Sequence, residues 1–471
     1  MLEYIDGGFI MALNEFLKSR IEDAKKLVNL LGKEYDYVSV LGTYTKFKKI
    51  STNKNINDMQ DLDKDVGFVI KLFKDEQAFE YSCNDIKDLD IDELKQAIIL
   101  SSLKQERVSL KPFEEEKIEQ SFKRLDESNL SDSEILDKLI NIRKIIEDFD
   151  SRIIQVRCML QKREVNSIFV SANKCLSQVY SWTNVMALAV SRQESIVKQA
   201  YTTENDVNTL KALNDMEDKA LGFAQLAINL LKAKPIVPGT YDIITHPTIS
   251  GLIAHEAFGH GVELDMFVKN RAKAKDYVGK KVASEKVSMH DGAASVISSA
   301  SYFFDDDGVL AKDTCIIENG ILKKGISDLL SAMQLNLEPT GNGRRQSFDH
   351  KSYSRMTNTF FMPGEDDVDK MIKSISHGYM LIDTDNGMED PKNWGIQCTA
   401  SYGLEIKDGK FTGEIVAPVV ISGYVVDLLQ SISMVSKEFK VTGSGMCGKG
   451  YKEWVYVSDG GPYMKGVAKL S

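Results

Sequence analysis

The chain has 471 residues, of which 43% are hydrophobic and 27% are charged, and its formal net charge is −10 at pH 7. A chain of this length can bury a large core and is expected to divide into two or more domains. The acidic balance disfavours a nucleic-acid partner, because proteins that bind nucleic acids usually carry a basic face. No apolar run reaches the ~18 residues that cross a membrane, so we expect no membrane partner.

The N-terminus and the cysteines point to the cytoplasm. The first eight residues lack the basic stretch and the long apolar stretch of a secretory signal, and Met11 is an alternative start to Met1. The six cysteines are widely scattered and form no CxxC pair. Because dense cysteine frameworks belong to oxidising compartments, we expect a cytoplasmic protein with free thiols.

The first part of the chain alternates between helical and extended patterns. Apolar residues at helical spacing predict a helix over residues 12–32, with Gly32 as its C-terminal stop. The alternation in residues 35–50 is typical of a β-hairpin. Residues 67–73 and 78–82 predict a second hairpin, with a short turn between them.

Longer helices and strands follow in the chain. Residues 91–103 have a helical pattern. The sequence from Ser131 to Glu134 is a capping box, which predicts a helix that ends near Phe149. The pattern from residue 151 to 203 favours β-strands, and the pattern from 206 to 232 returns to helix.

Prolines divide the chain into two predicted domains. Pro235 and the pair Pro238-Gly239 interrupt the pattern, so we place the boundary between residues 234 and 235. Residues 1–234 are expected to form a domain with hairpins and long helices. Residues 235–471 open with a short strand and an apolar helix, and then become rich in β-strands. The predicted fold class is α+β, with two mixed α/β domains of which the C-terminal one is built on β-sheet.

Two histidines and a glutamate stand close together in this apolar helix, in the sequence His255-Glu256-Ala257-Phe258-Gly259-His260. Two histidines beside one carboxylate have the composition of a zinc site with its own general base. The histidines are five residues apart, which puts them roughly 140° apart on a regular α-helix. They can share a metal only if the backbone departs from regularity, and Gly259 can allow a π-type bulge. The alternative is one core histidine, one surface histidine and an ordinary helix carboxylate.

A metal held by two histidines needs a third protein ligand, which leaves the fourth position to water. Cys447 is one candidate, because the glycines around it let its backbone approach another element and Lys449 favours a thiolate. It can equally be a buried cysteine in a tight turn. The other candidate ligands are His246, His290, Glu263 and Asp265. The carboxylates of Glu263 and Asp265 could instead orient the histidines or be solvated charges.

Three arginines lie in or after segments rich in glycine and asparagine. Arg344 and Arg345 end the sequence PTGNGRR, and Arg355 begins the sequence RMTN. Guanidinium groups presented by such turns could bind a substrate carboxylate or a backbone carbonyl. The alternative is a hairpin turn whose arginines pair with surface acids.

Taken together, these segments resemble the TldD/PmbA family of peptide-processing metalloproteases, and its TldD branch in particular. The resemblance is clear over about residues 235–460 and diffuse before them. It is specific because several strings, each weak alone, occur together and in order. The strings are HEAFGHGVELD (255–265), DDDG (305–308), IENGILK (317–323), PTGNGRR (339–345), RMTN (355–358) and MCGKG (446–450).

The resemblance implies a zinc ion held by His255, His260 and Cys447, with Glu256 as the catalytic base. It also implies a dimer that encloses the active site, in which residues 1–234 would serve dimerisation and substrate enclosure. The PmbA-like branch of the family lacks the histidine motif and supplies a non-catalytic partner, whereas this chain keeps every metal-site position. We therefore expect a homodimer or a heterodimer with a PmbA-like subunit.

Two functions compete on these observations. A zinc-dependent peptidase would cleave small unfolded peptides, in maturation or degradation, through a metal-activated water and Glu256. A non-catalytic peptide-binding or scaffold subunit would hold the metal as a structural ion. A gyrase-associated regulator has only a historical family association, and the acidic composition disfavours it. One departure from the family pattern, at Gly450-Tyr451-Lys452, bears on peptide binding near the metal and not on metal ligation.

Overall fold

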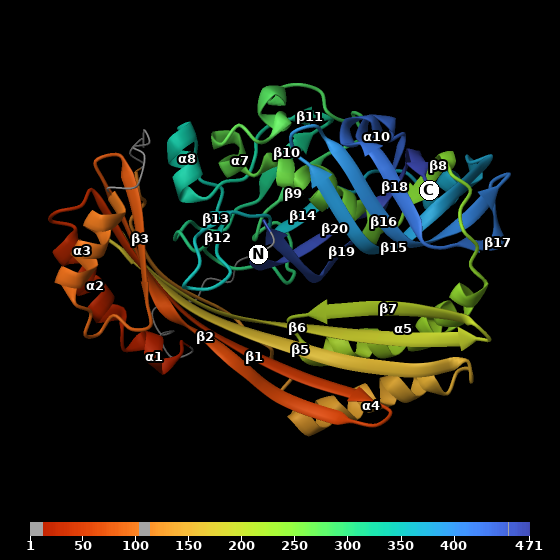
Figure 1. The fold of residues 1–471 in the computed structure, drawn as a ribbon, viewed down its shortest axis with the longest axis horizontal. Helices are drawn as coiled ribbons and strands as arrows, with labels where there is room; N and C mark the ends of the chain where they lie inside the picture. Colours follow the sequence, from red (N-terminus) through yellow and green to blue (C-terminus); the bar gives the residue numbers. More distant parts are fainter. Residues whose placement is uncertain (1–12, 103–113, 451) are drawn as a thin grey trace.

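The computed structural model describes residues 13–102, 114–450 and 452–471 (Figure 1). Both candidate starts, Met1 and Met11, lie outside these residues. The strands form two large sheets, one of seven strands from the first part of the chain and one of eleven strands from the rest. The predicted α+β class is confirmed. None of the helices in the described parts of the chain is long and apolar enough to cross a membrane.

The first sheet has the order β3-β2-β1-β5-β6-β4, with β7 paired to β6. Its strands are antiparallel except for the short strand β4, which pairs with β6 in parallel. Helices α4 and α5 pack against one end of the sheet, and α1 to α3 lie at the other end (Figure 1). The elements of this part are α1 (Glu15–Lys18), α2 (Ile21–Leu31), β1 (Tyr37–Asn53), β2 (Asn57–Lys74), β3 (Gln77–Cys83), α3 (Ile91–Ser102), β4 (Ile118–Arg124), α4 (Asp132–Glu147), β5 (Ile153–Ser171), β6 (Lys174–Gln193), β7 (Ile196–Asp206), α5 (Thr209–Asn229) and the 3-10 turn η2 (Leu230–Lys232).

The hairpin predicted within residues 35–50 is wrong. These residues belong to the single strand β1, which pairs with β2 on one side and with β5 on the other. A long, partly buried strand produces the same alternation of residues as a hairpin. Gly42 does not turn the chain, because it is paired inside the strand with Phe68 on one side and Ile168 on the other. A Cβ at this position would lie 2.6 Å from Cε1 of Phe68. The glycine leaves room for that ring.

Other local predictions for this part are confirmed. The second hairpin is β2–β3, and its turn residues Asp75 and Glu76 both have positive φ angles, of 49° and 62°. The side chain of Ser131 accepts a hydrogen bond from the backbone N–H of Glu134, whose carboxylate accepts one from the backbone N–H of Ser131. The helix predicted over residues 12–32 is divided into α1 and α2 over its described residues.

The second sheet has the strand order β11-β10-β9-β14-β20-β18-β16-β15-β8, with β17 and β19 attached to β16 and β20. Its elements are β8 (Gly239–Thr245), α6 (Pro247–Leu252), the π-helix η3 (Ile253–Gly259), η4 (His260–Val262), α7 (Leu264–Val268), η5 (Lys273–Tyr277), β9 (Met289–Asp291), β10 (Thr314–Glu318), β11 (Ile321–Leu322), α8 (Leu329–Leu335), β14 (Asn358–Phe361), α9 (Val368–Lys373), β15 (His377–Asp390), β16 (Gly395–Lys407), β17 (Lys410–Val416), β18 (Val419–Tyr424), α10 (Val425–Ser431), β19 (Met434–Lys449) and β20 (Lys452–Leu470). A separate ribbon joins β12 (Gly343–Arg344) to β13 (Tyr353–Ser354).

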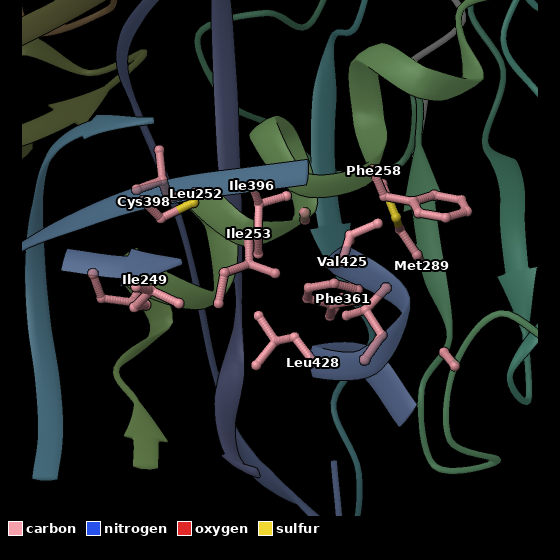
Figure 2. Packing of buried hydrophobic residues seen from close by; sticks show 14 of the residues in the cluster. Ile249, Leu252, Ile253, Phe258, Met289, Phe361, Ile396, Cys398, Val425 and Leu428 are labelled. Carbon is pink, nitrogen blue, oxygen red and sulfur yellow. The ribbon is translucent and has the colours of Figure 1, made fainter. Parts of the chain in front are cut away.

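The helix that carries the histidine motif is packed inside the largest apolar core (Figure 2). Ile249 and Ile253, which lie one turn apart, are both buried. They pack with side chains from the second sheet and from α10, among them Ile396, Cys398, Phe361, Val425 and Leu428. Burial of apolar side chains on this scale stabilises the backbone around them, so the motif stands on a rigid support.

Candidate metal centre

The two motif histidines lie on a helix that changes its hydrogen-bonding pattern. His246 caps the start of α6, Pro247 occupies its first position, and the helix then continues as the π-helix η3 and the 3-10 turn η4. In a π-helix the hydrogen bonds join residues i and i+5, so residues five apart lie near one another. The rings of His255 and His260 accordingly have centroids 5.2 Å apart and are nearly perpendicular, at 86°. The backbone departs from a regular α-helix between them, as a shared site at this spacing requires.

Gly259 contributes space more than backbone freedom. Its φ of −63° and ψ of −48° are ordinary helical angles that any residue adopts. A Cβ at this position would lie only 2.1 Å from the Sδ atom of Met356, which is fully buried. The glycine therefore allows the segment between β13 and β14, which carries Met356, to approach the π-helix closely.

Cys447, on β19, reaches the histidine pair from the other side. Its Sγ atom lies 3.3 Å from Nε2 of His260. One donor atom from each of His255, His260 and Cys447 falls within 4.8 Å of the other two. His255 and Cys447 are 3% and 6% exposed, so the three donors meet in a largely buried place.

The histidines determine the charge state of the thiol. Burial alone would raise the pKa of Cys447, but the imidazoles of His260 and His255 outweigh this effect and hold the pKa well below its ordinary value. A thiolate is the form of cysteine that binds metals.

Glu256 lies beside the converging donors. Its Oε2 atom is 4.0 Å from Nε2 of His260, the same ring nitrogen that faces Cys447. The side chain of Glu256 is 21% exposed. Strand β15 passes close to it, because a Cβ on Gly387 would lie 2.5 Å from Cγ of Glu256. The carboxylate is thus held next to the donors and remains accessible to water.

The two carboxylates that follow the motif have different surroundings. Oε2 of Glu263 lies 3.5 Å from Nδ1 of His260 and accepts a hydrogen bond of 2.9 Å from Lys449. Asp265 accepts hydrogen bonds from Lys449 at 2.7 Å and from Lys269 at 3.0 Å. Of these two carboxylates, only Glu263 contacts a histidine among the described residues, so only it is placed to orient one of the motif rings.

The three arginines of the glycine-rich segments take up separate positions. Arg344 donates to the backbone oxygens of Met356 and Tyr456, and it lines a cavity of about 770 Å³ between the first sheet and the β19–β20 hairpin. Arg345 lies 3.2 Å from Glu80 in an ion pair with β3. Arg355 is 1% exposed and donates to the backbone oxygen of Cys447 at 2.8 Å. Its burial leaves no surface on Arg355 for a substrate.

The other histidines considered as ligands lie elsewhere. Nδ1 of His246 is 2.8 Å from the hydroxyl of Thr248, at the start of α6. Nδ1 of His290 is 2.9 Å from Asp313. Among the described residues, the group of donors around the motif contains His255, His260 and Cys447 and neither of these two histidines.

Two further carboxyl groups near the motif carry no signal in the sequence. Oε2 of Glu389, on β15, accepts a hydrogen bond of 3.2 Å from the backbone N–H of Gly261. Burial raises the pKa of Glu389 to about 8. Asp459, on β20, lies against α6, since a Cβ on Gly251 would be 2.5 Å from its Oδ1 atom, and burial raises its pKa to about 6. Both residues are distant in sequence, so only the fold brings them to the motif.

The residues present fit a zinc ion. Two imidazoles and one thiolate are a donor set that zinc binds, and three protein ligands with an open position are typical of catalytic sites. Nδ1 of His255 is buried and has no hydrogen-bond partner among the described residues. A buried ring nitrogen without a partner costs free energy, which an added cation or hydrogen-bond partner would recover.

Comparison with known sequences links the second part of the chain to metallopeptidases. Residues 238–465 match the PmbA/TldA metallopeptidase C-terminal domain. A metalloprotease of Methanothermobacter thermautotrophicus is 34% identical over 251 residues, which are 53% of this chain and 54% of the relative. A zinc metalloprotease TldD homolog of Saccharolobus solfataricus is 30% identical over 293 residues, which are 62% of this chain and 64% of the relative. The chain thus matches less than two thirds of the length of either relative.

Solved structures share the fold over nearly the whole chain. A protein of Thermotoga maritima, described as a proposed modulator of a DNA gyrase, superposes with a TM-score of 0.77 at 20% identity and covers 96% of this chain and 99% of its own. TldE from Thermococcus kodakarensis has a TM-score of 0.73 at 19% identity and covers 95% and 100%. At these identities the likeness establishes the fold alone.

Proposed function

Since the chain belongs to the TldD/PmbA family, we propose that it is a zinc-dependent peptidase that cleaves small unfolded peptides. The observation that carries the proposal is the convergence of His255, His260 and Cys447 within 4.8 Å of one another, beside the carboxylate of Glu256. The names of the matched relatives, metalloprotease and zinc metalloprotease, support the same chemistry. In this proposal the domain of residues 235–471 carries the peptidase site.

A zinc ion held by these three residues would supply Lewis acidity, which makes a water molecule acidic near neutral pH and polarises a carbonyl. Glu256 is the proposed general base. Its carboxylate lies 4.0 Å from Nε2 of His260, the nitrogen that faces Cys447, and its side chain is partly exposed. It would take a proton from the attacking water and pass it to the leaving amine. Glu263, at Nδ1 of His260, would keep that ring in the orientation that exposes Nε2.

Strand β15 is the proposed support for the peptide. It pairs with β16 along its length, but with β8 only over residues 378–381. Within the described ranges, no strand pairs with the other edge of β15 beyond residue 381. Gly387, on this segment, packs against Glu256. An extended peptide could add to this edge through backbone hydrogen bonds, which would give recognition with little dependence on sequence.

Arg344 remains a candidate for a substrate contact. It lines the 770 Å³ cavity together with Tyr180, Tyr302 and Tyr456, and its guanidinium stands 5.6 Å from the centre of the Tyr302 ring. A carboxylate of a bound peptide could pair with such a group. Arg345 also borders this cavity, but its guanidinium already forms an ion pair with the carboxylate of Glu80.

Residues 1–234 are proposed to serve dimerisation and substrate enclosure. The partner would be a second copy of the chain or a PmbA-like subunit, and the likeness in fold to TldE is compatible with either arrangement. An enclosed site would admit unfolded chains and exclude folded ones, which agrees with the proposed substrate class.

Replacement of Glu256 tests the proposal directly. Glu256→Gln keeps the size of the side chain and removes the base, so cleavage of an unstructured peptide mixture should fall at least about 100-fold while bound zinc per chain stays the same. The assay is run on the chain alone and together with a PmbA-like protein. Retained zinc with unchanged cleavage would show that Glu256 is not the base. Zinc binding without any cleavage by the unaltered chain in both settings would favour the alternative, a peptide-binding or scaffold subunit with a structural metal.

A further inference from the structure

Two positively charged side chains, those of Lys449 and Arg355, bind groups next to the candidate metal ligands. Nζ of Lys449 donates to Oε2 of Glu263 at 2.9 Å, and this oxygen lies 3.5 Å from Nδ1 of His260. Nη2 of Arg355 donates to the backbone oxygen of Cys447 at 2.8 Å. Glu263 and Arg355 are each 1% exposed. One cation therefore holds the carboxylate behind a histidine, and the other holds the backbone of the cysteine.

The two halves of this arrangement face each other. Nε of Arg355 lies 3.6 Å from Oε1 of Glu263. Both atoms are buried, and neither has a hydrogen-bond partner among the described residues. Opposite charges in a buried place attract more strongly than in water. Arg355 thus spans from the carboxylate behind His260 to the main chain of Cys447, although the histidine and the cysteine belong to different elements.

We propose that Lys449 and Arg355 are positioning residues, which hold Glu263 against His260 and the main chain of Cys447 in place so that the nitrogen and sulfur donors converge. The inference rests on the proposed function only for the identity of the metal ligands. Neither cation contacts the reacting atoms. Loss of the outer hydrogen-bond partners of metal ligands typically weakens metal binding by about 10- to 100-fold.

Lys269 offers a matched control for Lys449. Both lysines donate to the carboxylate of Asp265, Lys449 to Oδ1 at 2.7 Å and Lys269 to Oδ2 at 3.0 Å. Only Lys449 continues to Glu263. The side chain of Lys449 is 17% exposed and that of Lys269 is 44% exposed. Lys449 also donates to the backbone oxygen of Ser354 at 3.2 Å. A difference between their variants therefore reports the contacts of Lys449 with Glu263 and Ser354, and not the loss of one positive charge near Asp265.

The experiment measures metal binding by the full chain, independently of cleavage. Zinc affinity is determined by competition with a chelator, and cobalt(II) is added to follow the thiolate-to-cobalt absorption band. Lys449→Met is expected to weaken zinc binding about 10- to 100-fold and to alter the cobalt band. Arg355→Lys, which keeps the charge but loses the fork that spans two groups, is expected to weaken binding about 10-fold. Lys269→Met should stay within about twofold of the unaltered chain.

The outcomes separate this inference from the proposed function. Zinc affinity and a cobalt band unchanged in both Lys449→Met and Arg355→Lys would overturn the positioning role, even if peptide cleavage were observed. Weakened binding in both variants would support it, even if the unaltered chain cleaved no peptide. Circular dichroism of the metal-free chains checks folding. Should Lys449→Met fail to fold, Arg355→Lys decides by the same two measurements.

Discussion

Lys71 and Asp307 form a buried ion pair that joins the first sheet to the part of the chain that carries the candidate metal centre. Nζ of Lys71, on β2, also lies 3.0 Å from Glu80, and that carboxylate lies 3.2 Å from Nη2 of Arg345. Arg345 is buried, whereas the side chain of Glu80 is 22% exposed. Charges from both parts of the chain thus neutralise one another where the parts meet.

Removal of the lysine should destabilise the protein strongly. Lys71→Met keeps most of the volume but leaves the carboxylate of Asp307 buried without its cation. Breaking a buried ion pair in this way typically costs roughly 3–5 kcal/mol. Urea unfolding at pH 7 measures the change. Lys234→Met, which removes an ion pair with Glu414 between side chains that are 67% and 50% exposed, is the control and should cost less than about 1 kcal/mol. Equal losses in the two variants would contradict the prediction.

The same cluster should make the free energy of unfolding depend on pH in the acid range. Partial burial alone would raise the pKa of Glu80, but Lys71 and Arg345 outweigh it and lower the pKa to about 2. A group with a lowered pKa stabilises the fold above its ordinary value near 4.5, and this contribution is lost as the pH falls toward 2. The urea midpoints of the unaltered chain and of Glu80→Gln should therefore differ at pH 7 and converge as the pH falls from about 4.5 toward 2. A constant difference across this range would rule out the assignment.

Loss of the thiol should remove metal. Cys447→Ser replaces the sulfur donor by a weak neutral one, so zinc per chain, measured after dialysis against a mild chelator, should fall by at least about 10-fold. Cys315→Ser changes a half-buried cysteine on β10 and should retain zinc. The prediction fails if Cys447→Ser holds as much zinc as Cys315→Ser.

Gly259 should tolerate no side chain. Gly259→Ala brings a Cβ to within 2.1 Å of Sδ of Met356, so either the methionine or the π-helix must move, at a cost of about 1–3 kcal/mol. Zinc affinity should fall with it. Gly222→Ala, on α5, meets nothing within 4 Å and should stabilise the protein by roughly 0.5–1 kcal/mol. In the Met356→Ala background, where the clashing sulfur is absent, Gly259→Ala should cost less than it does in the unaltered chain. Thermal unfolding of the unaltered chain, the three single variants and the double variant gives the comparison.

The spacing of His255 and His260 predicts an irregular helix on the condition that both bind one metal, because two side chains five residues apart cannot face one ligand from a regular α-helix. The reason for the glycine between them was not predictable. Gly259 has ordinary helical angles, and its constraint comes from Met356, which is 97 residues further along the chain. Local patterns report backbone preferences but not which distant side chain comes close.

Residues that act through long-range contacts were the hardest to predict. Cys447 is 187 residues from His260 and became the leading third ligand only through the family resemblance. The sequence places Arg355 among the candidate substrate-binding arginines, because its burial depends on how β19 and β20 pack around it and no local pattern reports this. The wrong prediction of a hairpin in residues 35–50 has a similar cause, because the alternation of residues does not show where a strand ends.

The long sequence separation between Cys447 and the two histidines has a consequence for the lifetime of the protein in the cell. A zinc ion bound by Cys447 and the two histidines would cross-link residues that are far apart in the second half of the chain. It would bind the folded form alone. Each tenfold rise in free zinc above the dissociation constant would then add about 1.4 kcal/mol to the free energy of unfolding. A chain starved of the ion would be degraded more readily, so the abundance of the protein would follow the supply of the metal.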